Sequence, residues 1–175
     1  MRLKKLFFFF LYYLIFKHFP SSSFFAVGKF SKRMRYMCCR NFFKQCGSNV
    51  NIERNASFGL GFELEIGDNS GIGKNCSIPS NIKIGRDVMF APNVTILASN
   101  HNFSRTDIPM RLQGHTQALQ TIIEDDVWIG MDVLMTPGRT VKTGSIIAAG
   151  TVLTKDFPAY SIIGGNPSRL IRSRI

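Results

Sequence analysis

Twelve apolar residues recur at intervals of six along this chain, in two runs separated by a gap. The first run is Ile66, Ile72, Ile78, Ile84, Phe90 and Ile96, and the second is Ile123, Ile129, Met135, Val141, Ile147 and Leu153. A helix returns a side chain to the same face every 3.6 residues and a plain strand every 2 residues, so neither sustains a period of six. A coil of short strands does, because each strand and its turn return one side chain to the interior.

A second periodic position supports the coil. Four residues after most of the twelve apolar positions lies a small or β-branched residue: Ser70, Cys76, Ile82, Val88, Val94, Val127, Val133, Ser145 and Thr151, with Arg139 as the exception. Three six-residue units would make one triangular turn of about eighteen residues. Ile66 should then stack beneath Ile84. In the same way, Ile72 should stack beneath Phe90. The alternative is a β-sandwich with evenly spaced turns, which two runs of six in register disfavour.

The repeat resembles that of the hexapeptide-repeat acyltransferases. The resemblance covers roughly residues 50–172, with an earlier, looser turn near Ile52 and Phe58 and a phase shift of two residues around Leu64. It implies an all-β fold, a left-handed parallel β-helix, although the general crossover rule favours the opposite hand. We expect residues 50–175 to form this domain, with a catalytic loop at 99–121 and a helical, membrane-associating appendage at 1–49.

The net charge of +11 is concentrated at the N-terminal end. Residues 1–54 hold eleven basic residues and one acidic residue, Glu53, which gives +10, whereas residues 55–175 carry +1. A nucleic-acid-binding protein would carry its positive charge on the folded domain. The near-neutral repeat domain therefore argues against nucleic acid as a partner. A basic segment beside an apolar run indicates contact with anionic lipid headgroups.

That apolar run is residues 6–16, which are rich in phenylalanine and flanked by Lys4, Lys5 and Lys17. As a helix the run is about 16 Å long, about half of what is needed to cross a hydrocarbon core. Three interpretations stay open: an anchor in one leaflet, a helix that caps the coil, and a secretory signal with a poor cleavage site. The anchor predicts a cytoplasmic protein held peripherally at the inner face of the cell membrane. Residues 24–43 could form a second amphipathic helix.

Cysteine and histidine spacing predicts no metal site. Cys38 and Cys39 are adjacent, Cys46 follows, and no histidine lies near them in the sequence to complete a zinc set. Cys76 falls on an inward repeat position, which is typical of a small core residue.

The repeat stops after Ile96 and resumes at Ile123, and the excursion between them is polar and rich in turn formers. A long loop that leaves a regular coil is usually functional. Its opening Asn100-His101 pair matches the motif that carries the catalytic histidine in the acyltransferase family. The resemblance therefore implies that His101 is the general base, with Asn100 and Gln113 as substrate-binding residues.

General-base chemistry supports the same residue. Moving an acyl group from a thioester to a hydroxyl requires removal of the hydroxyl proton as its oxygen attacks. A neutral imidazole can take that proton at pH 7 and pass it to the leaving thiolate. His115 lies in the same loop but lacks the motif, and His18 lies in the basic appendage.

A second set of residues resembles the coenzyme A site of the family. Trp128 directly precedes the repeat residue Ile129, so its indole should point outward from the coil. In the family the corresponding tryptophan lies beside the pantetheine arm of coenzyme A, and the backbone at the position of Ala149 binds the same arm. Met131 is assigned to this site as well.

The C-terminal strings Thr154-Lys155-Asp156 and 164–169 resemble the family's C-terminal signature. The resemblance implies that Thr154, Lys155, Arg169 and Arg172 bind coenzyme A. Ammonium and guanidinium groups suit its phosphates.

The resemblance also implies partners. Family members are homotrimers in which the loop overhangs a neighbour, and we expect the same here. The loop and the string 124–128 look most like the branch that acetylates exopolysaccharide, capsule or O-antigen sugars, whose acceptors are commonly built on a lipid carrier at the inner membrane face. We therefore predict an acetyl-coenzyme A-dependent O-acetyltransferase of a polysaccharide or lipid-linked sugar. The alternative is a non-catalytic or metal-binding β-helix scaffold, for which His101 and His115 supply two of three required histidines.

Overall fold

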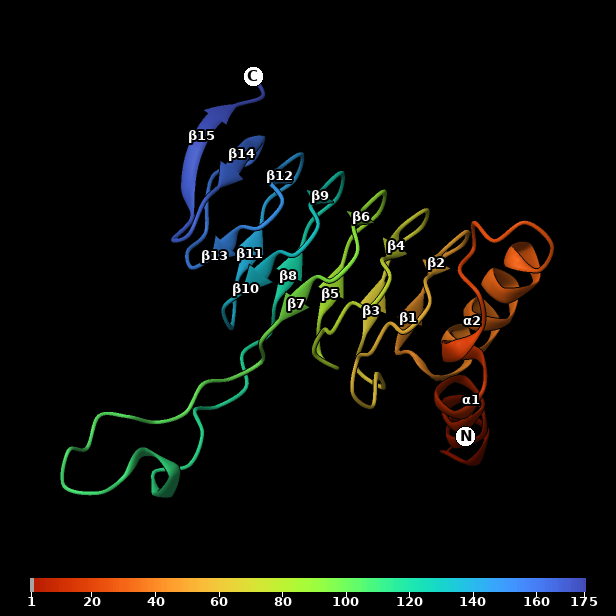
Figure 1. Ribbon diagram of the computed structural model, residues 1–175, viewed down its shortest axis with the longest axis horizontal. Helices are drawn as coiled ribbons and strands as arrows, with labels where there is room; N and C mark the ends of the chain where they lie inside the picture. The colour runs from red at the N-terminus through yellow and green to blue at the C-terminus, as the bar shows by residue number, and fades with distance from the viewer. Residues whose placement is uncertain (1) are drawn as a thin grey trace.

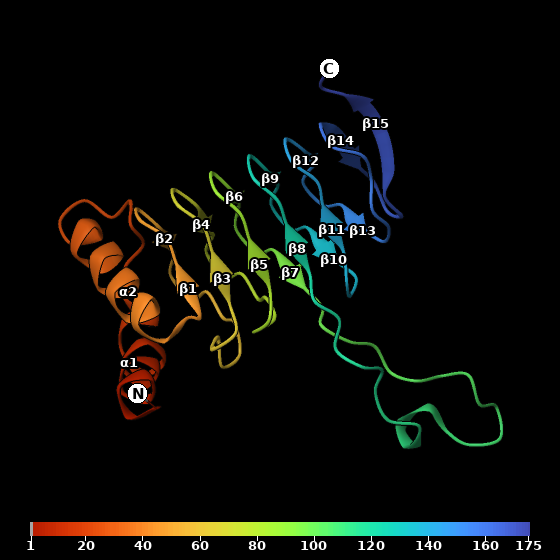
Figure 2. The same cartoon turned by 180° about the vertical axis from the view of Figure 1, so that it is seen from behind.

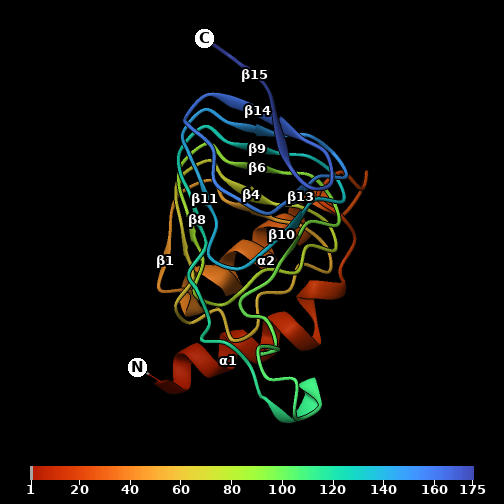
Figure 3. The same cartoon turned by 90° about the vertical axis from the view of Figure 1, so that its left-hand side faces the viewer.

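The computed structural model describes residues 2–175 and shows a three-sided coil of short strands, with two helices at its N-terminal end and a long loop that leaves its side (Figure 1). Nearly all strands are two residues long, because each ends at a corner where the chain turns to the next face. Figure 3 looks nearly along the coil and shows the turns lying over one another. The predicted parallel β-helix with a helical N-terminal appendage is confirmed.

The strands form three sheets, one on each face of the coil. The β1 face carries β1 (Gln45–Cys46), β3 (Glu65–Ile66), β5 (Lys83–Ile84), β8 (Ile122–Ile123) and β11 (Thr140–Val141). The β2 face carries β2 (Asn51–Ile52), β4 (Gly71–Ile72), β6 (Met89–Phe90), β9 (Trp128–Ile129), β12 (Ile146–Ile147), β14 (Ser161–Gly164) and β15 (Arg169–Ser173). The β7 face carries β7 (Thr95–Ile96), β10 (Leu134–Met135) and β13 (Val152–Leu153). Within these sheets neighbouring strands run parallel, except that β15 is antiparallel to β14.

The six-residue period sets the register between turns. Ile66 pairs with Ile84, and Gly71 pairs with Met89, so that Ile72 stacks beneath Phe90 as predicted. Each of the twelve periodic apolar residues is at most 8% exposed, which confirms the predicted core. Cys76 is also buried, and its burial raises the pKa of the thiol to about 11.

The first turn of the coil is longer than the others. Gln45 pairs with Glu65, an offset of 20 residues, whereas Glu65 pairs with Lys83, an offset of 18. The two extra residues fall in the segment 59–63, next to Leu64, where the phase shift was predicted. A Cβ at Gly61 would lie 3.0 Å from the rings of both Phe42 and Phe58, so this turn packs closely against aromatic side chains.

Asparagine and aspartate residues form many of the corners. Eight of them have positive φ angles between 53° and 62°: Asn49, Asn55, Asn69, Asn75, Asp87, Asn93, Asp126 and Asp132. Side chains at successive corners are hydrogen-bonded, as where Asn75 Nδ2 donates to Asn93 Oδ1 at 3.2 Å. Short polar side chains tolerate this left-handed backbone better than other L-residues do, so the corner positions select them.

Helix α1 (Arg2–Leu14) packs across the N-terminal end of the coil. Tyr12 is fully buried, its ring lies 5.1 Å from that of Phe58, and its hydroxyl donates to the carbonyl of Ala56 at 2.8 Å. Tyr13 donates to the carbonyl of Gly59 at 2.7 Å. A coil leaves an apolar end that must be covered, and α1 covers it. The short helix η1 (Phe16–His18) continues this contact, because Phe16 is also buried.

Helix α2 (Gly28–Phe42) is joined to the same end by a buried guanidinium. Arg35 is fully buried and donates from Nε to the carbonyl of Ile52 at 2.5 Å and from Nη1 to the carbonyl of Pro20 at 2.9 Å. Its Nη2 lies 3.7 Å from the Glu53 carboxylate. One side chain thus joins α2, the linker after η1 and the first turn of the coil. Within residues 2–175, no helix is long and apolar enough to cross a membrane.

Candidate active site

The excursion between the two repeat runs is an arm made of two facing segments. The backbone N–H of Asn102 donates to the carbonyl of Gly114 at 3.0 Å, and the N–H of Thr116 donates to the carbonyl of Asn100 at 2.8 Å. A short helix, η2 (Met110–Leu112), lies near the tip. The arm projects far from its own coil (Figures 1 and 2).

The arm brings its two histidines together. His101 and His115 form an antiparallel bridge, and their imidazole rings are 4.2 Å apart between centroids with an interplanar angle of 38°. Both side chains are exposed in the single chain. Exposure leaves the nitrogens of His101 accessible to a substrate. In the sequence His115 ranks second to His101 as a candidate base, and nothing in the sequence predicts that the two rings touch.

Asn100 and Gln113 lie in the same arm but in different situations. Asn100 is exposed, and its backbone bonds with Thr116 hold the base of the arm. The Gln113 amide is occupied by the loop itself: Nε2 donates to the carbonyls of Arg105 at 2.7 Å and Ile108 at 3.1 Å, and Oε1 accepts from the Arg105 N–H at 3.1 Å. Gln113 therefore shapes the tip of the arm.

An apolar stripe runs along the outside of the β2 face. Met89 pairs with Trp128, Trp128 pairs with Ile146, and Ile146 pairs with Ile162. Trp128 is 48% exposed and Met89 is 60% exposed, so the indole points outward as predicted. Arg172 pairs with Ile162 and thus lies in line with the stripe. Trp128 and Arg172 are three strand spacings apart, about 14 Å.

Met131 and Ala149 lie beside Trp128 on stacked turns. The N–H of Gly150 donates to the carbonyl of Met131 at 2.8 Å, and a Cβ at Gly130 would lie only 2.5 Å from the nitrogen of Ala149. Both Met131 and Ala149 are exposed. The small Ala149 leaves the backbone of its turn open to a ligand lying along the coil, beside the exposed Met131 side chain.

The four C-terminal candidates gather at the last turns of the coil. The Thr154 N–H donates to Ser168 Oγ at 3.1 Å, which places Thr154 next to Arg169. Lys155 lies 5.5 Å over the Phe157 ring. Arg169 and Arg172 are exposed on β15, and within residues 2–175 neither they nor Lys155 lie within ion-pair distance of a carboxylate. These cations are therefore available to an anionic ligand.

A groove of about 280 Å³, which was not predicted from the sequence, adjoins the stripe. Its polar lining consists of Lys32, Asn49, Asn51, Glu53, Asn69 and Ser70, and its floor includes Gly71, Gly73 and Met89. Gly71 occupies an outward position on β4 between Asn51 and Met89. Because glycine has no side chain there, the surface is hollowed. The sequence signal for this groove was Gly71, a glycine at an outward strand position near Asn49, Asn51 and Asn69.

One chain does not bring all these residues together. The β2 face with Trp128 and the groove lies on one side of the coil, and the arm leaves from the opposite side (Figures 1, 2 and 3). His101 is therefore distant from the stripe of its own chain.

Family models match both runs of the repeat. The model described as bacterial transferase hexapeptide (six repeats) matches residues 64–98, and that of the hexapeptide repeat of succinyl-transferase matches residues 120–155. The interruption between the two matches corresponds to the arm. The family resemblance that the sequence suggested is thus supported on both sides of the arm.

Curated relatives carry acetyltransferase names. The Saccharomyces cerevisiae protein YJL218W, whose name assigns it provisionally to the acetyltransferases, is 37% identical over 135 residues, covering 76% of this chain and 67% of that protein. The galactoside O-acetyltransferase of Escherichia coli is 33% identical over 135 residues, covering 76% of this chain and 65% of that enzyme. The chain spans about three fifths to two thirds of the length of the curated relatives it matches.

Solved structures agree in fold. A maltose O-acetyltransferase from Clostridium difficile matches with a TM-score of 0.77 and 29% identity, over 98% of this chain and 87% of that one. A hexapeptide-repeat acetyltransferase from Vibrio cholerae in complex with acetyl coenzyme A matches with a TM-score of 0.72 and 28% identity, over 81% and 76% of the two chains. The first match extends over the N-terminal helices as well as the coil.

Proposed function

This chain belongs to the hexapeptide-repeat acetyltransferase family, and from that premise we propose that it is an acetyl-coenzyme A-dependent O-acetyltransferase whose acceptor is a hydroxyl of a saccharide. The observation that carries the proposal is the alignment on the β2 face. The exposed indole of Trp128 and the cations Arg169 and Arg172 lie on this face, with Ile146 and Ile162 between Trp128 and Arg172. Such a surface suits a long ligand with an apolar arm and an anionic end.

The proposed binding mode of the donor follows that order. The pantetheine arm would lie along Trp128, Met131 and Ala149, where the small, exposed Ala149 allows close approach to the backbone. The phosphates would lie near Arg169 and Arg172, with Thr154 and Lys155 beside them, because guanidinium and ammonium groups bind phosphate oxygens strongly.

The proposed acceptor site is the groove next to the stripe. Amide, carboxylate and ammonium groups line it together with the apolar Met89. Sugars present hydroxyls and apolar C–H faces, and a pocket with a few polar groups beside an apolar one suits them. Named relatives acetylate galactosides and maltose. We propose a polysaccharide or lipid-linked sugar of the exopolysaccharide, capsule or O-antigen type, acetylated at the inner face of the cell membrane.

His101 is proposed as the general base. Its imidazole accepts the proton of the acceptor hydroxyl while the hydroxyl oxygen forms a bond to the thioester carbonyl carbon. The carbon–sulfur bond then breaks, and the imidazolium returns the proton to the leaving thiolate. No covalent enzyme intermediate is required. Asn100, one residue before the base and exposed, is proposed to contact the acceptor.

A homotrimer with C3 symmetry is proposed because the site of one chain is incomplete. The arm, which contains His101, leaves the coil on the side away from β9, which contains Trp128 (Figure 1). In a closed ring, each arm would reach the β2 face of a neighbour, and three equivalent sites would result.

A thiol-release assay tests the activity. The purified chain, supplied with acetyl-coenzyme A and a panel of soluble saccharides, should release free thiol only when an acceptor sugar is present. Mass spectrometry should find one acetyl group added to the sugar. If neither product forms with any sugar, while the protein binds zinc stoichiometrically, the metal-binding scaffold becomes the better explanation.

A further inference from the structure

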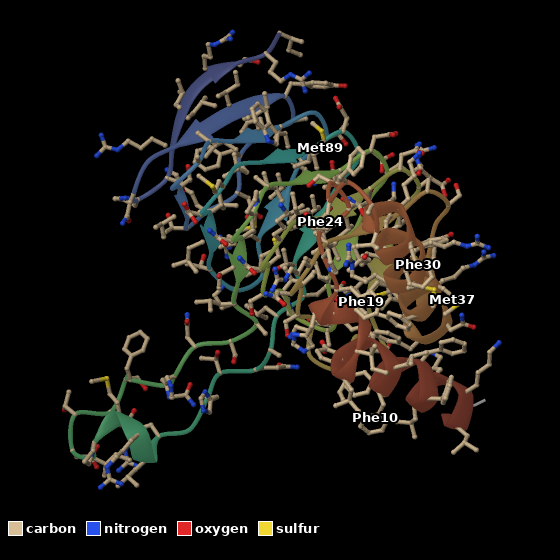
Figure 4. The ribbon with its side chains drawn as sticks, turned by 45° about the vertical axis from the view of Figure 1, so that its right-hand side comes forward. Phe10, Phe19, Phe24, Phe30, Met37 and Met89 are labelled. Carbon is tan, nitrogen blue, oxygen red and sulfur yellow. The ribbon has the colours of Figure 1, made fainter. Side chains whose placement is uncertain are left out.

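The outer side of α1 is an apolar surface that the coil does not use. The helix buries one face on the coil, where Phe8, Phe9, Tyr12 and Tyr13 pack against the core. Its opposite side exposes Leu3, Leu6, Phe7, Phe10 and Leu14, which follow one another at helical spacing, and we call this set the α1 stripe. Phe7 is 61% exposed and Phe10 is 53% exposed. In Figure 4, Phe10 projects from the side of α1 that faces away from the coil.

The charge around the α1 stripe indicates what covers this surface. Lys4 and Lys5 lie within α1 and Lys17 follows it, and the sequence from residue 1 to residue 52 contains no acidic residue. A second copy of this helix would bring like charges together, which disfavours a contact between two α1 stripes. An anionic bilayer surface offers both apolar burial and opposite charge.

We propose that the α1 stripe docks on an anionic lipid bilayer, so that one helix caps the coil with one face and binds the membrane with the other. The helix is too short to span a membrane and lies along its surface. This inference extends the proposed function, because it supplies the contact that would hold the enzyme near a lipid-linked acceptor.

Sedimentation of the full chain with vesicles tests the docking. Vesicles of phosphatidylcholine with phosphatidylglycerol should bind the chain, and vesicles of phosphatidylcholine alone should bind it less. The double variant F7S/F10S should bind the anionic vesicles at least about tenfold more weakly, because two exposed phenylalanines no longer enter the interface. Its unfolding temperature should match that of the unmodified chain, since neither side chain supports the core.

A matched control changes apolar residues of similar exposure at the far end of the molecule. Leu170 and Ile175 are 51% and 89% exposed, and the variant L170S/I175S should bind vesicles like the unmodified chain. High salt should weaken binding only in part, because screening acts on the charges and not on the apolar contact.

Three results would overturn the inference: the full chain fails to bind anionic vesicles, F7S/F10S binds them normally, or F7S/F10S lowers the mass of the oligomer in solution. The last result would show that the stripe joins two copies of the chain. Acetyl transfer to a soluble sugar is measured on the same preparations. Vesicle binding without acetyl transfer would support the docking and contradict the proposed function. Acetyl transfer without vesicle binding would support the proposed function and contradict the docking.

Discussion

The imidazole of His101 lies against that of His115, with 4.2 Å between ring centroids, although the two residues are on opposite segments of the arm. The contact restricts the orientation of both rings. We propose that His115 orients the ring of the proposed base, His101. A substitution of His115 that keeps a ring against His101 should therefore affect activity less than a substitution that removes the imidazole nitrogens of His101.

Replacing His101 with alanine should lower kcat by about 10²- to 10⁴-fold, the usual contribution of a general base. Affinity for coenzyme A should stay near normal, because its proposed site lies on the β2 face. His115→Phe keeps a flat ring against His101 and should retain most of the activity. Steady-state kinetics and a direct coenzyme A binding measurement check both. If His101→Ala keeps full activity and His115→Phe loses it, the base is His115.

Mixing two inactive variants tests whether the site joins two chains. In the proposed homotrimer, we expect His101→Ala and Trp128→Ala each to be poorly active when pure. After the two are unfolded together and refolded as mixed trimers, about a quarter of the sites should combine an intact arm with an intact neighbouring face. If the mixed trimers regain about a quarter of the activity of the unmodified protein, the site is shared between two chains. No recovery in confirmed mixed trimers would place His101 and Trp128 of one site on the same chain.

The sequence predicted the coil because its period is a local property. Ile66, Ile84 and Ile123 stack in register simply because the chain completes a turn between one and the next. The contact between His101 and His115 depends on how the two segments of the arm align, and no periodicity encodes that alignment. The burial of Tyr12 against Phe58 depends on a contact between distant segments. For the same reason, the sequence left the anchor and cap interpretations of α1 open.

Corner asparagines should be replaceable by glycine but not by alanine. Asn93 has a φ of 62°, and its amide donates to Asp132 Oδ1 at 2.9 Å. Alanine at this position should lower the free energy of unfolding by about 1–2 kcal/mol, the cost of a left-handed backbone for an ordinary L-residue. Asn93→Gly avoids that strain, and the loss should be about 1 kcal/mol or less because the lost hydrogen bond is exposed. Urea unfolding of the two variants compares these values, and equal losses would contradict the backbone explanation.

Acid should destabilise the coil through carboxylates that hold its corners. The Arg86 backbone N–H, which donates to Asp125 at 2.7 Å, and the Arg86 guanidinium lower the pKa of that carboxyl. Hydrogen bonds from Ser48 lower the pKa of Asp68. A lowered folded-state pKa gives stability that is complete above the ordinary carboxyl value and is lost as pH falls through the folded value. The two carboxyls should therefore leave the unfolding temperature unchanged above about pH 5, and the unfolding temperature should fall below about pH 4. In the variant Asp125→Asn, the unfolding temperature should fall less steeply as the pH is lowered. An equally steep fall would show that Asp125 does not contribute to the acid sensitivity.

The cap function of α1 predicts that Tyr12 matters for stability, whereas Phe10, two residues away, does not. Tyr12→Ala removes a fully buried ring from the coil end and should lower the free energy of unfolding by about 3–5 kcal/mol, as for other large aromatic truncations. Tyr12→Phe loses only the hydrogen bond to the Ala56 carbonyl and should cost about 1 kcal/mol. Phe10→Ser should stay within about 0.5 kcal/mol, because the side chain is exposed. Urea unfolding measures all three. Deletion of residues 1–20 should uncover the coil end and cause aggregation, so a stable, monodisperse truncation would show that the coil needs no cap from α1.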